Sequence, residues 1–580
     1  MTRVLVSVAG IAALTCAAYV AVQAQDKFVP VTQKMLENPS PDDWLMYSRT
    51  YDAQRFSPLK QITKSNVGQL KEAFHKEIGN GPHESIPIAY RGVLYVQSPG
   101  AAIQALNGAT GETIWEYKYA SGGSSRAKAL SIFDDMVYYT APDNSIVALD
   151  AMTGAERWKV KTPGGATAGT IVVDGKVLSG RACGNNGTAC YVLALDAKTG
   201  KELWKFYTVA QDSDPEAAKT WGGVPQEKRE ASQWGLPGGY DPQRKLVFWG
   251  ISNPMPNTRM ARHNGNPDAV SYDTPSDLYS NSTVALNPET GKLVWYYQHL
   301  PGDDWDEDYP HERTLIRTAV NPDPKFVKWI NPDIRKGQQR DISLSVGEGG
   351  GMWALDRQTG QFLWATPFPF DHPNFLISNI DPKTGRVSIN KSLMFTGYDQ
   401  HHVICYWNTR SYWPTAYSPQ HNALYVPYLE NCLDMTSVDP KNGRDKRGGI
   451  MAPGANMDTW QGLMKINAST GEMTPLFKEH APSNGAVLAT AGDVLFWGDL
   501  DHMFRAFDAD SGKVLWEQKL NGPVQNSTIT YAVNGKQYVA VLTGVGLNTA
   551  GIIDQAGIKP NRTYNAVYVF GLPGGTTNTK

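Results

Sequence analysis

Five acidic residues stand within six positions near the middle of the chain: Asp303, Asp304, Asp306, Glu307 and Asp308. On an extended strand, Asp306 and Asp308 would point to the same face, because side chains alternate with a period of two. Two carboxylates on one face repel each other unless a proton, a cation or solvent separates them. Oxygen ligands of this kind suit a hard cation such as calcium. The cluster predicts either a cation site or a solvated acidic loop.

Two side chains upstream have the chemistry to act with these acids. Trp234 offers a flat aromatic surface, and Asn253, before Pro254, offers an amide oxygen. Taken singly, a Trp is more often a core residue and an Asn before Pro is a natural turn residue. Whether these residues form a site depends on the fold that positions them.

The composition and the N-terminus exclude some partners and suggest a compartment. The 580-residue chain has a formal net charge of −2, which argues against nucleic acid or an anionic membrane as a partner. Residues 1–24 read as a signal peptide, with Arg3, an apolar core and a cleavage site near Ala24. A retained membrane anchor is the alternative, and no later segment is apolar for long enough to span a bilayer. We therefore expect residues 25–580 in the periplasm.

Export would leave four cysteines in an oxidising compartment, where an even number favours disulfides. The most economical pairs are Cys183–Cys190 and Cys405–Cys432. A zinc site is less favoured, because the spacings lack close CxxC pairs. The sequence also contains neither a CxxCH site for covalent haem nor a strand–GxGxxG–helix fingerprint for NAD.

One sequence motif, called the phrase below, recurs along the chain. In it an apolar strand ends at Asp or Asn, Thr-Gly or Ser-Gly makes a turn, and a second strand leads to Trp. It occupies residues 105–115, 148–158, 194–204, 285–295, 354–364 and 506–516, with a degenerate copy at 465–472. Glycine supplies the positive φ that such turns need. A Trp at the same place in each unit is interpreted as a plug between neighbouring units.

A further strand pair precedes each phrase, so each unit has about four short antiparallel strands. This pattern predicts an all-β fold, an eight-bladed β-propeller with Trp-docking repeats, as a single domain over residues 25–580. The long gaps from Trp204 to Trp295 and from Trp364 to Trp516 must hold insertions. Residues 565–570 form a last strand able to pair with N-terminal strands. A propeller does not define a function, and a binding scaffold is the rival interpretation.

The repeat and the residues above resemble the pyrroloquinoline quinone (PQQ) dependent alcohol dehydrogenases, nearest to the branch of sorbose, sorbosone and deoxynivalenol dehydrogenases. The resemblance extends from Trp44 to Pro573. It implies a periplasmic enzyme that oxidises an alcohol or polyol by hydride transfer to PQQ beside a metal. It also implies a separate electron acceptor, such as a soluble cytochrome c.

The resemblance assigns a role to each of seven residues. The cofactor would contact Glu84, Arg126, Thr167 and Trp234, and the metal would contact Asn253, Asp306 and Asp308. Asp306 would also be the catalytic base that takes the proton of the substrate hydroxyl. Asp308 occupies the position at which lanthanide-using members carry an extra aspartate.

The chain departs from the family pattern at three places. Ser124 and Ser125 replace a vicinal Cys pair, and Asn185 stands in the loop where a metal-binding Glu is expected. Glu348 replaces the Lys or Arg expected near the reactive quinone carbonyl. The Trp413-Pro414 pair is kept. Because the loop Glu is missing, we expect calcium, with a lanthanide as the alternative.

A metal-dependent hydrolase is a third interpretation of the acidic cluster. It requires a second set of metal ligands, and the chain has no His-rich set to provide it. His401 and His402, near Cys405, are interpreted as structural residues.

Overall fold

The computed structural model describes residues 28–100, 102–121, 123, 126–183, 189–407, 409–411, 413–483, 485–525, 527–546 and 550–574. The predicted signal peptide, residues 1–24, lies outside these ranges. Strands make up most of the regular secondary structure in the described residues, which also contain four short α-helices. These are α1 (Gln33–Glu37), α2 (Pro215–Lys219), α3 (Arg259–Arg262) and α4 (Ala550–Ala556).

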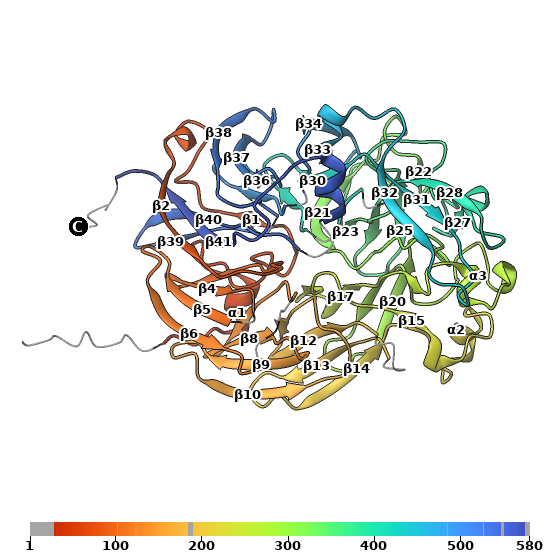
Figure 1. Cartoon of the computed structure of the whole chain (residues 1–580), viewed down its shortest axis with the longest axis horizontal. Helices are drawn as coiled ribbons and strands as arrows, with labels where there is room; N and C mark the ends of the chain where they lie inside the picture. The colour runs from red at the N-terminus through yellow and green to blue at the C-terminus, as the bar shows by residue number, and fades with distance from the viewer. Residues whose placement is uncertain are drawn as a thin grey trace, which may run out of the picture.

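Eight sheets of four or five strands occur in the described residues, and Figure 1 shows them around a common centre. The first is β3 (Ile88–Tyr90), β4 (Val93–Gln97), β5 (Ala102–Asn107) and β6 (Thr113–Lys118). The second is β7 (Ser131–Phe133), β8 (Met136–Thr140), β9 (Ser145–Asp150) and β10 (Glu156–Lys161). The third is β11 (Ile171–Val173), β12 (Lys176–Arg181), β13 (Tyr191–Asp196) and β14 (Glu202–Tyr207). The fourth is β16 (Gly239–Asp241), β17 (Leu246–Gly250), β19 (Ser282–Leu286) and β20 (Leu293–Gln298).

The next three sheets follow the same antiparallel plan, two of them with an added edge strand. The fifth is β21 (Thr314–Val320), β23 (Gln338–Val346), β24 (Met352–Asp356), β25 (Phe362–Thr366) and β22 (Trp329–Ile330). The sixth is β29 (Ala416–Ser418), β30 (Ala423–Leu429), β33 (Gln461–Asn467) and β34 (Met473–Glu479). The seventh is β1 (Phe56–Ser57), β35 (Leu488–Thr490), β36 (Val494–Gly498), β37 (Met503–Asp508) and β38 (Val514–Lys519).

The eighth sheet joins the two ends of the described chain. It contains β39 (Thr528–Val533), β40 (Lys536–Leu542), β41 (Ala566–Gly571) and the N-terminal strand β2 (Lys71–Glu77). β2 pairs antiparallel with β41, with Phe74 opposite Val569. The predicted pairing of the last strand with an N-terminal strand is therefore confirmed, and the contact is visible in Figure 1.

The repeated tryptophans contact the turn of the following sheet. The Trp115 indole donates to the carbonyl of Ala151 at 3.0 Å, and Trp158 donates to Ala197 at 3.1 Å. A Cβ atom on Gly154 would lie 2.5 Å from the Trp115 ring. The turn thus needs glycine for two reasons, its positive φ and the indole packed against it.

The predicted insertions occur in the two long gaps between repeated tryptophans. The first gap holds α2, α3 and the pair β15 (Glu230–Ala231) and β18 (Pro254–Met255). The second holds β26 (Ile377–Ile380) with β27 (Val387–Ile389), and a three-stranded sheet. That sheet contains β28 (His401–Cys405), β31 (Asn431–Thr436) and β32 (Lys446–Met451). Loops of this length often carry function.

Both predicted disulfides are present in the structure. Cys405 joins β28 to Cys432 in β31, and Cys183 pairs with Cys190 after β12. His401, in β28, forms an ion pair with Asp434 across the same small sheet, which fits its interpretation as a structural residue. In the described part of the chain, every helix is too short or too polar to cross a membrane.

Candidate functional site

The four predicted cofactor residues occupy equivalent places in four successive sheets. Glu84, Arg126, Thr167 and Trp234 precede β3, β7, β11 and β16, which are the first strands of their sheets. Parallel bridges join Ile86 to Ala129 and Ala129 to Gly169. Neighbouring entry segments therefore run side by side, which brings residues about 40 positions apart into contact.

Glu84 is a buried carboxylate that faces two cations. Arg126 Nη2 lies 3.3 Å from Glu84 Oε1, and Lys128 Nζ lies 3.1 Å from Oε2. The side chain of Lys128 is 0% exposed, and burial lowers its pKa although Glu84 opposes the shift. The sequence indicated Glu84 and Arg126 but not Lys128. The run Arg126-Ala-Lys128 was the available signal, because alternate residues share a face in extended chain.

The backbone of Trp234 is held in place by residues of the same cluster. Thr167 Oγ1 donates to the Trp234 carbonyl at 2.8 Å, and Lys128 Nζ donates to it at 3.1 Å. Lys128 Nζ also lies 5.3 Å from the centroid of the indole ring. Trp413 and Pro414 line a small cavity together with Glu84 and Lys128. The structure thus places the predicted Glu, Arg, Thr and Trp in one connected group.

Asp308 links Trp234 to the acidic cluster. Its Oδ2 accepts a hydrogen bond from the Trp234 indole at 2.7 Å, and its Oδ1 accepts one from the Asn253 backbone at 3.0 Å. Burial, reinforced by the neighbouring charge of Asp306, raises the pKa of Asp308 to about 8. The aromatic surface and the acids, predicted separately, therefore meet in space.

Asp306 is the most accessible of the five acids, and it contacts groups from two insertions. Its Oδ1 accepts from the Asn253 side-chain amide at 3.0 Å, and its Oδ2 forms an ion pair with Arg447 of β32. The backbone of Asp306 has φ 69°, a left-handed conformation that a non-glycine residue rarely adopts. The expectation of an extended strand at this point was wrong. The chain turns at Asp306, and Asn253 donates hydrogen bonds to both Asp306 and Asp308.

Two further buried carboxylates surround this pair. Glu307 and Glu348 have pKa values well above their usual range, first because they are buried and then because other acids lie close by. A cation does lie near these acids: Arg447 interacts electrostatically with Asp306, Glu307, Asp308 and Glu348. Sequence reasoning missed Arg447 because β32 belongs to an insertion 141 residues from Asp306.

The interpretation of the acids as a solvated loop was wrong. Only Asp306 is partly exposed; Asp303, Asp304, Glu307 and Asp308 are buried. Asp303 accepts from the backbone of Trp305 and Glu307, and Asp304 accepts from the backbone of Arg259 and Phe395. Burial raises the pKa of Asp303 to about 7 and that of Asp304 to about 6. These two acids shape the loop that presents Asp306.

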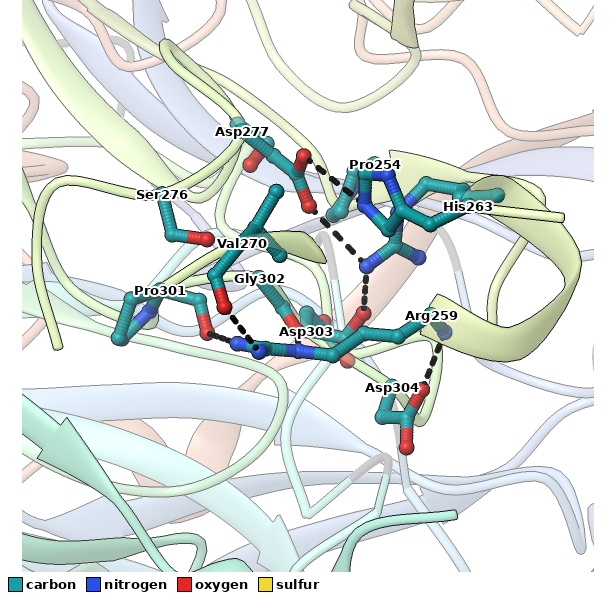
Figure 2. A network of polar contacts seen from close by, with 12 residues as sticks. Pro254, Arg259, His263, Val270, Ser276, Asp277, Pro301, Gly302, Asp303 and Asp304 are labelled. Carbon is teal, nitrogen blue, oxygen red and sulfur yellow. Dashed lines mark hydrogen bonds and ion pairs between the residues drawn. The ribbon is translucent and has the colours of Figure 1, made fainter. Parts of the chain in front are cut away.

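Two arginines of α3 hold the same loop, and Figure 2 shows Arg259 beside Pro301, Gly302 and Asp304. Arg259 Nε donates to the carbonyl of Gly302 at 2.8 Å, and Arg262 Nη2 donates to that of Asp303 at 2.8 Å. Asp277 neutralises Arg262 through a buried ion pair of 3.1 Å. The insertion that carries α3 thus positions the acidic cluster from behind.

We expect Asp277→Ala to destabilise the protein by about 3–5 kcal/mol, because it leaves the buried Arg262 without its counter-ion. Denaturant unfolding of the apo-protein measures the effect. Asp273→Ala is the control: Asp273 pairs with Arg386 at 3.5 Å on the surface, where loss of an ion pair costs about 0–1 kcal/mol. Equal stabilities for the two variants would contradict the assigned role of Asp277.

The oxygen donors of this site fit a hard cation. Asn253, Asp306 and Asp308 bring one amide and two carboxylates within hydrogen-bonding reach of each other. Within the described ranges, no three His, Cys, Asp or Glu side chains are arranged to hold a metal ion by themselves. Asn185 and the pair Ser124-Ser125 lie outside the described residues.

Comparison with known proteins identifies the class. The family model described as glucose/ethanol/alcohol dehydrogenase, β-propeller domain (PQQ), matches residues 44–131, 160–366 and 456–539. The quinohemoprotein alcohol dehydrogenase ADH-IIG of Pseudomonas putida is 30% identical over 92% of this chain and 77% of its own. The lanthanide-dependent methanol dehydrogenase of Methylacidiphilum fumariolicum is 30% identical over 93% of this chain and 91% of its own. A europium-containing methanol dehydrogenase has a TM-score of 0.79 at 26% identity, covering 93% of this chain and 100% of that one.

The chain belongs to the PQQ-dependent alcohol dehydrogenase family. The resemblance stated from the sequence is thereby confirmed at the level of the family, and the sorbose and deoxynivalenol branch stays a prediction.

Proposed function

We propose that this protein is a periplasmic quinoprotein that oxidises an alcohol or polyol hydroxyl to an aldehyde or ketone. The observation that carries the proposal is the direct hydrogen bond from Trp234 to Asp308, which joins the predicted cofactor surface to the predicted metal ligands. When bound, PQQ accepts two electrons from the alcohol, and the metal acts as a Lewis acid. A separate electron acceptor, which we propose to be a soluble cytochrome c, completes the cycle.

Each site residue has one task in this proposal. Trp234 supports the flat cofactor, while Thr167 and Lys128 keep its backbone in place. Glu84 orients the Arg126 guanidinium, which is free to turn toward a cofactor carboxylate because it is 28% exposed. Asp306, partly exposed at the centre, takes the proton of the substrate hydroxyl.

The proposed architecture is an eight-bladed propeller in one domain over residues 25–580. Its support is the set of eight sheets, the β2–β41 pairing and the indole contacts between successive sheets. The periplasmic location is supported by the two disulfides, since such bonds persist in oxidising compartments.

An activity assay tests the proposal. Purified apo-protein is incubated with PQQ and either Ca²⁺ or La³⁺, and a panel of primary alcohols, secondary alcohols and polyols is assayed with an artificial dye. We expect turnover that requires both PQQ and metal. A folded, quinone-loaded protein that oxidises no member of the panel with either metal would refute the proposed activity and leave the binding-scaffold interpretation.

Trp234→Ala should weaken PQQ binding by about 10–100-fold, because stacking on an aromatic face contributes on the order of 1–3 kcal/mol per ring. Trp234 is half-buried, so the variant should fold. Absorbance titration of the apo-protein with PQQ measures the affinity, with Trp516→Ala, which removes a half-buried Trp of β38, as the control. Unchanged affinity would make Trp234 a packing residue only.

We expect calcium at the metal site, with a lanthanide as the alternative. Asn253, Asp306 and Asp308 would supply two formal negative charges. Burial raises the pKa of Glu307 and of Glu348 well above their usual range, which favours the neutral form of both groups, and Arg447 pairs with Asp306. Metal titration of quinone-loaded apo-enzyme, wild type and Asp308→Ala, tests the assignment: we expect Ca²⁺ to restore activity, and activity restored only by La³⁺ and lost in the variant would overturn it.

A further inference from the structure

Arg181, the last residue of β12, is a buried cation without a protein partner. Its residue exposure is 0%, and none of its three guanidinium nitrogens has a hydrogen-bond acceptor. Arg181 alone shows this among the arginines of the described ranges. Arg55 and Arg259, which are equally buried, each donate to several backbone carbonyls.

Such a group is costly in a folded protein. A buried guanidinium gives up its hydration, and here no carboxylate or carbonyl restores it. Burial accordingly lowers the pKa of Arg181 to about 10, and the phenol of Tyr191 is the sole group that opposes the shift. Buried polar groups left unsatisfied by protein are commonly satisfied by a bound ligand or water. The fork of a guanidinium matches a carboxylate best.

The end of β12 contacts segments that carry two of the cofactor residues. A Cβ atom on Gly164, three residues before Thr167, would lie 3.4 Å from the Arg181 Cβ, and Gly165, two residues before Thr167, bridges to Ala182. On the other side of the strand, a Cβ atom on Gly180 would lie 2.6 Å from Gln233 Cβ. The end of β12 is thus enclosed by the segments that carry Thr167 and Trp234.

We propose that Arg181 binds a carboxylate of the quinone seated on Trp234, as a second anion clamp apart from Arg126. The inference rests on the proposed function, because it concerns the same bound group. It accounts for the orphaned guanidinium, since the ligand supplies the acceptor that the protein lacks.

Binding and stability measured on the same variants test this role. We compare wild type, Arg181→Met, Arg181→Lys and the matched buried control Arg259→Met. For each apo-protein, titration with PQQ and with PQQ trimethyl ester gives two affinities, and denaturant unfolding gives the stability. Neither readout depends on enzymatic turnover.

For Arg181→Met we expect PQQ affinity to fall about 10–100-fold, while the affinity for the ester stays within about twofold of wild type. Arg181→Lys should retain part of the affinity. The apo-protein of Arg181→Met should be at least as stable as wild type, whereas Arg259→Met, which loses bonds to Gly302 and Val270, should be less stable.

The informative quantity is the ratio of the affinity for PQQ to the affinity for PQQ trimethyl ester. If this ratio is the same in wild type and Arg181→Met, the inference is overturned. A loss of stability in Arg181→Met without a change in that ratio also overturns it, because Arg181 would then be a structural residue. Failure of the wild-type apo-protein to bind PQQ at all is a distinct result, and it removes the proposed function itself.

Discussion

Asp306→Asn should lower kcat for alcohol oxidation by about 10³-fold or more, since it removes the proton acceptor and one charged oxygen donor to the metal. The amide keeps the shape of the side chain, so its contact with Asn253 can remain. Because Asp306 is a partly exposed loop residue, we expect little change in the free energy of unfolding.

The experiment must separate catalysis from cofactor loss. Steady-state kinetics with an artificial dye are therefore combined with the quinone content of each preparation, measured by its near-ultraviolet absorption. Asp501→Asn, on the surface beside Lys519, is the matched control. An Asp306→Asn enzyme that is fully loaded and turns over at more than one tenth of the wild-type rate would exclude Asp306 as the base.

Replacing Arg447 has the second largest expected effect. Arg447→Met should lower kcat by about 10²-fold, which is the scale of the loss when one preorganised hydrogen-bond donor is removed from an active site. Its ion pair with Asp306 fixes the carboxylate, and it is the cation that offsets the acids around Asp308. Arg447 thus acts as a positioning residue that reaches the site from the second insertion.

Two comparisons distinguish this role from a structural one. Arg447→Lys should recover part of kcat with KM nearly unchanged, because a charge is restored without the guanidinium fork. Lys446→Met, the exposed neighbour on β32, should leave both constants unchanged. A loss of kcat of equal size in the Lys446 variant would mean that the strand, and not the charge of Arg447, is responsible.

The fold was predictable because its information is local and repeated. Six units carry the same turn glycine and the same terminal Trp, and the structure shows why both are needed: the indole of Trp115 packs directly on Gly154 of the next unit. The site residues before the first strands were predicted from the resemblance to the family, and the structure places Glu84, Arg126 and Thr167 at equivalent positions in successive units.

The remainder of the site depends on contacts that are distant in sequence. Arg447 meets Asp306 across 141 residues, and nothing near either residue indicates the other. Alternation along a strand predicted that Asp306 and Asp308 share a face, but the positive φ of Asp306 is imposed by the buried loop around Asp303. The sequence alone suggested that these acids are solvated. A carboxylate can be buried when backbone N–H groups donate to it, and only tertiary folding brings those groups close.

Titration of the apo-protein with PQQ, followed by absorbance in the presence of Ca²⁺ or La³⁺, shows whether this chain is a quinoprotein. We expect saturable binding of one quinone per chain that depends on the metal and is weakened in Trp234→Ala. A correctly folded apo-protein that binds no quinone with either metal would contradict it.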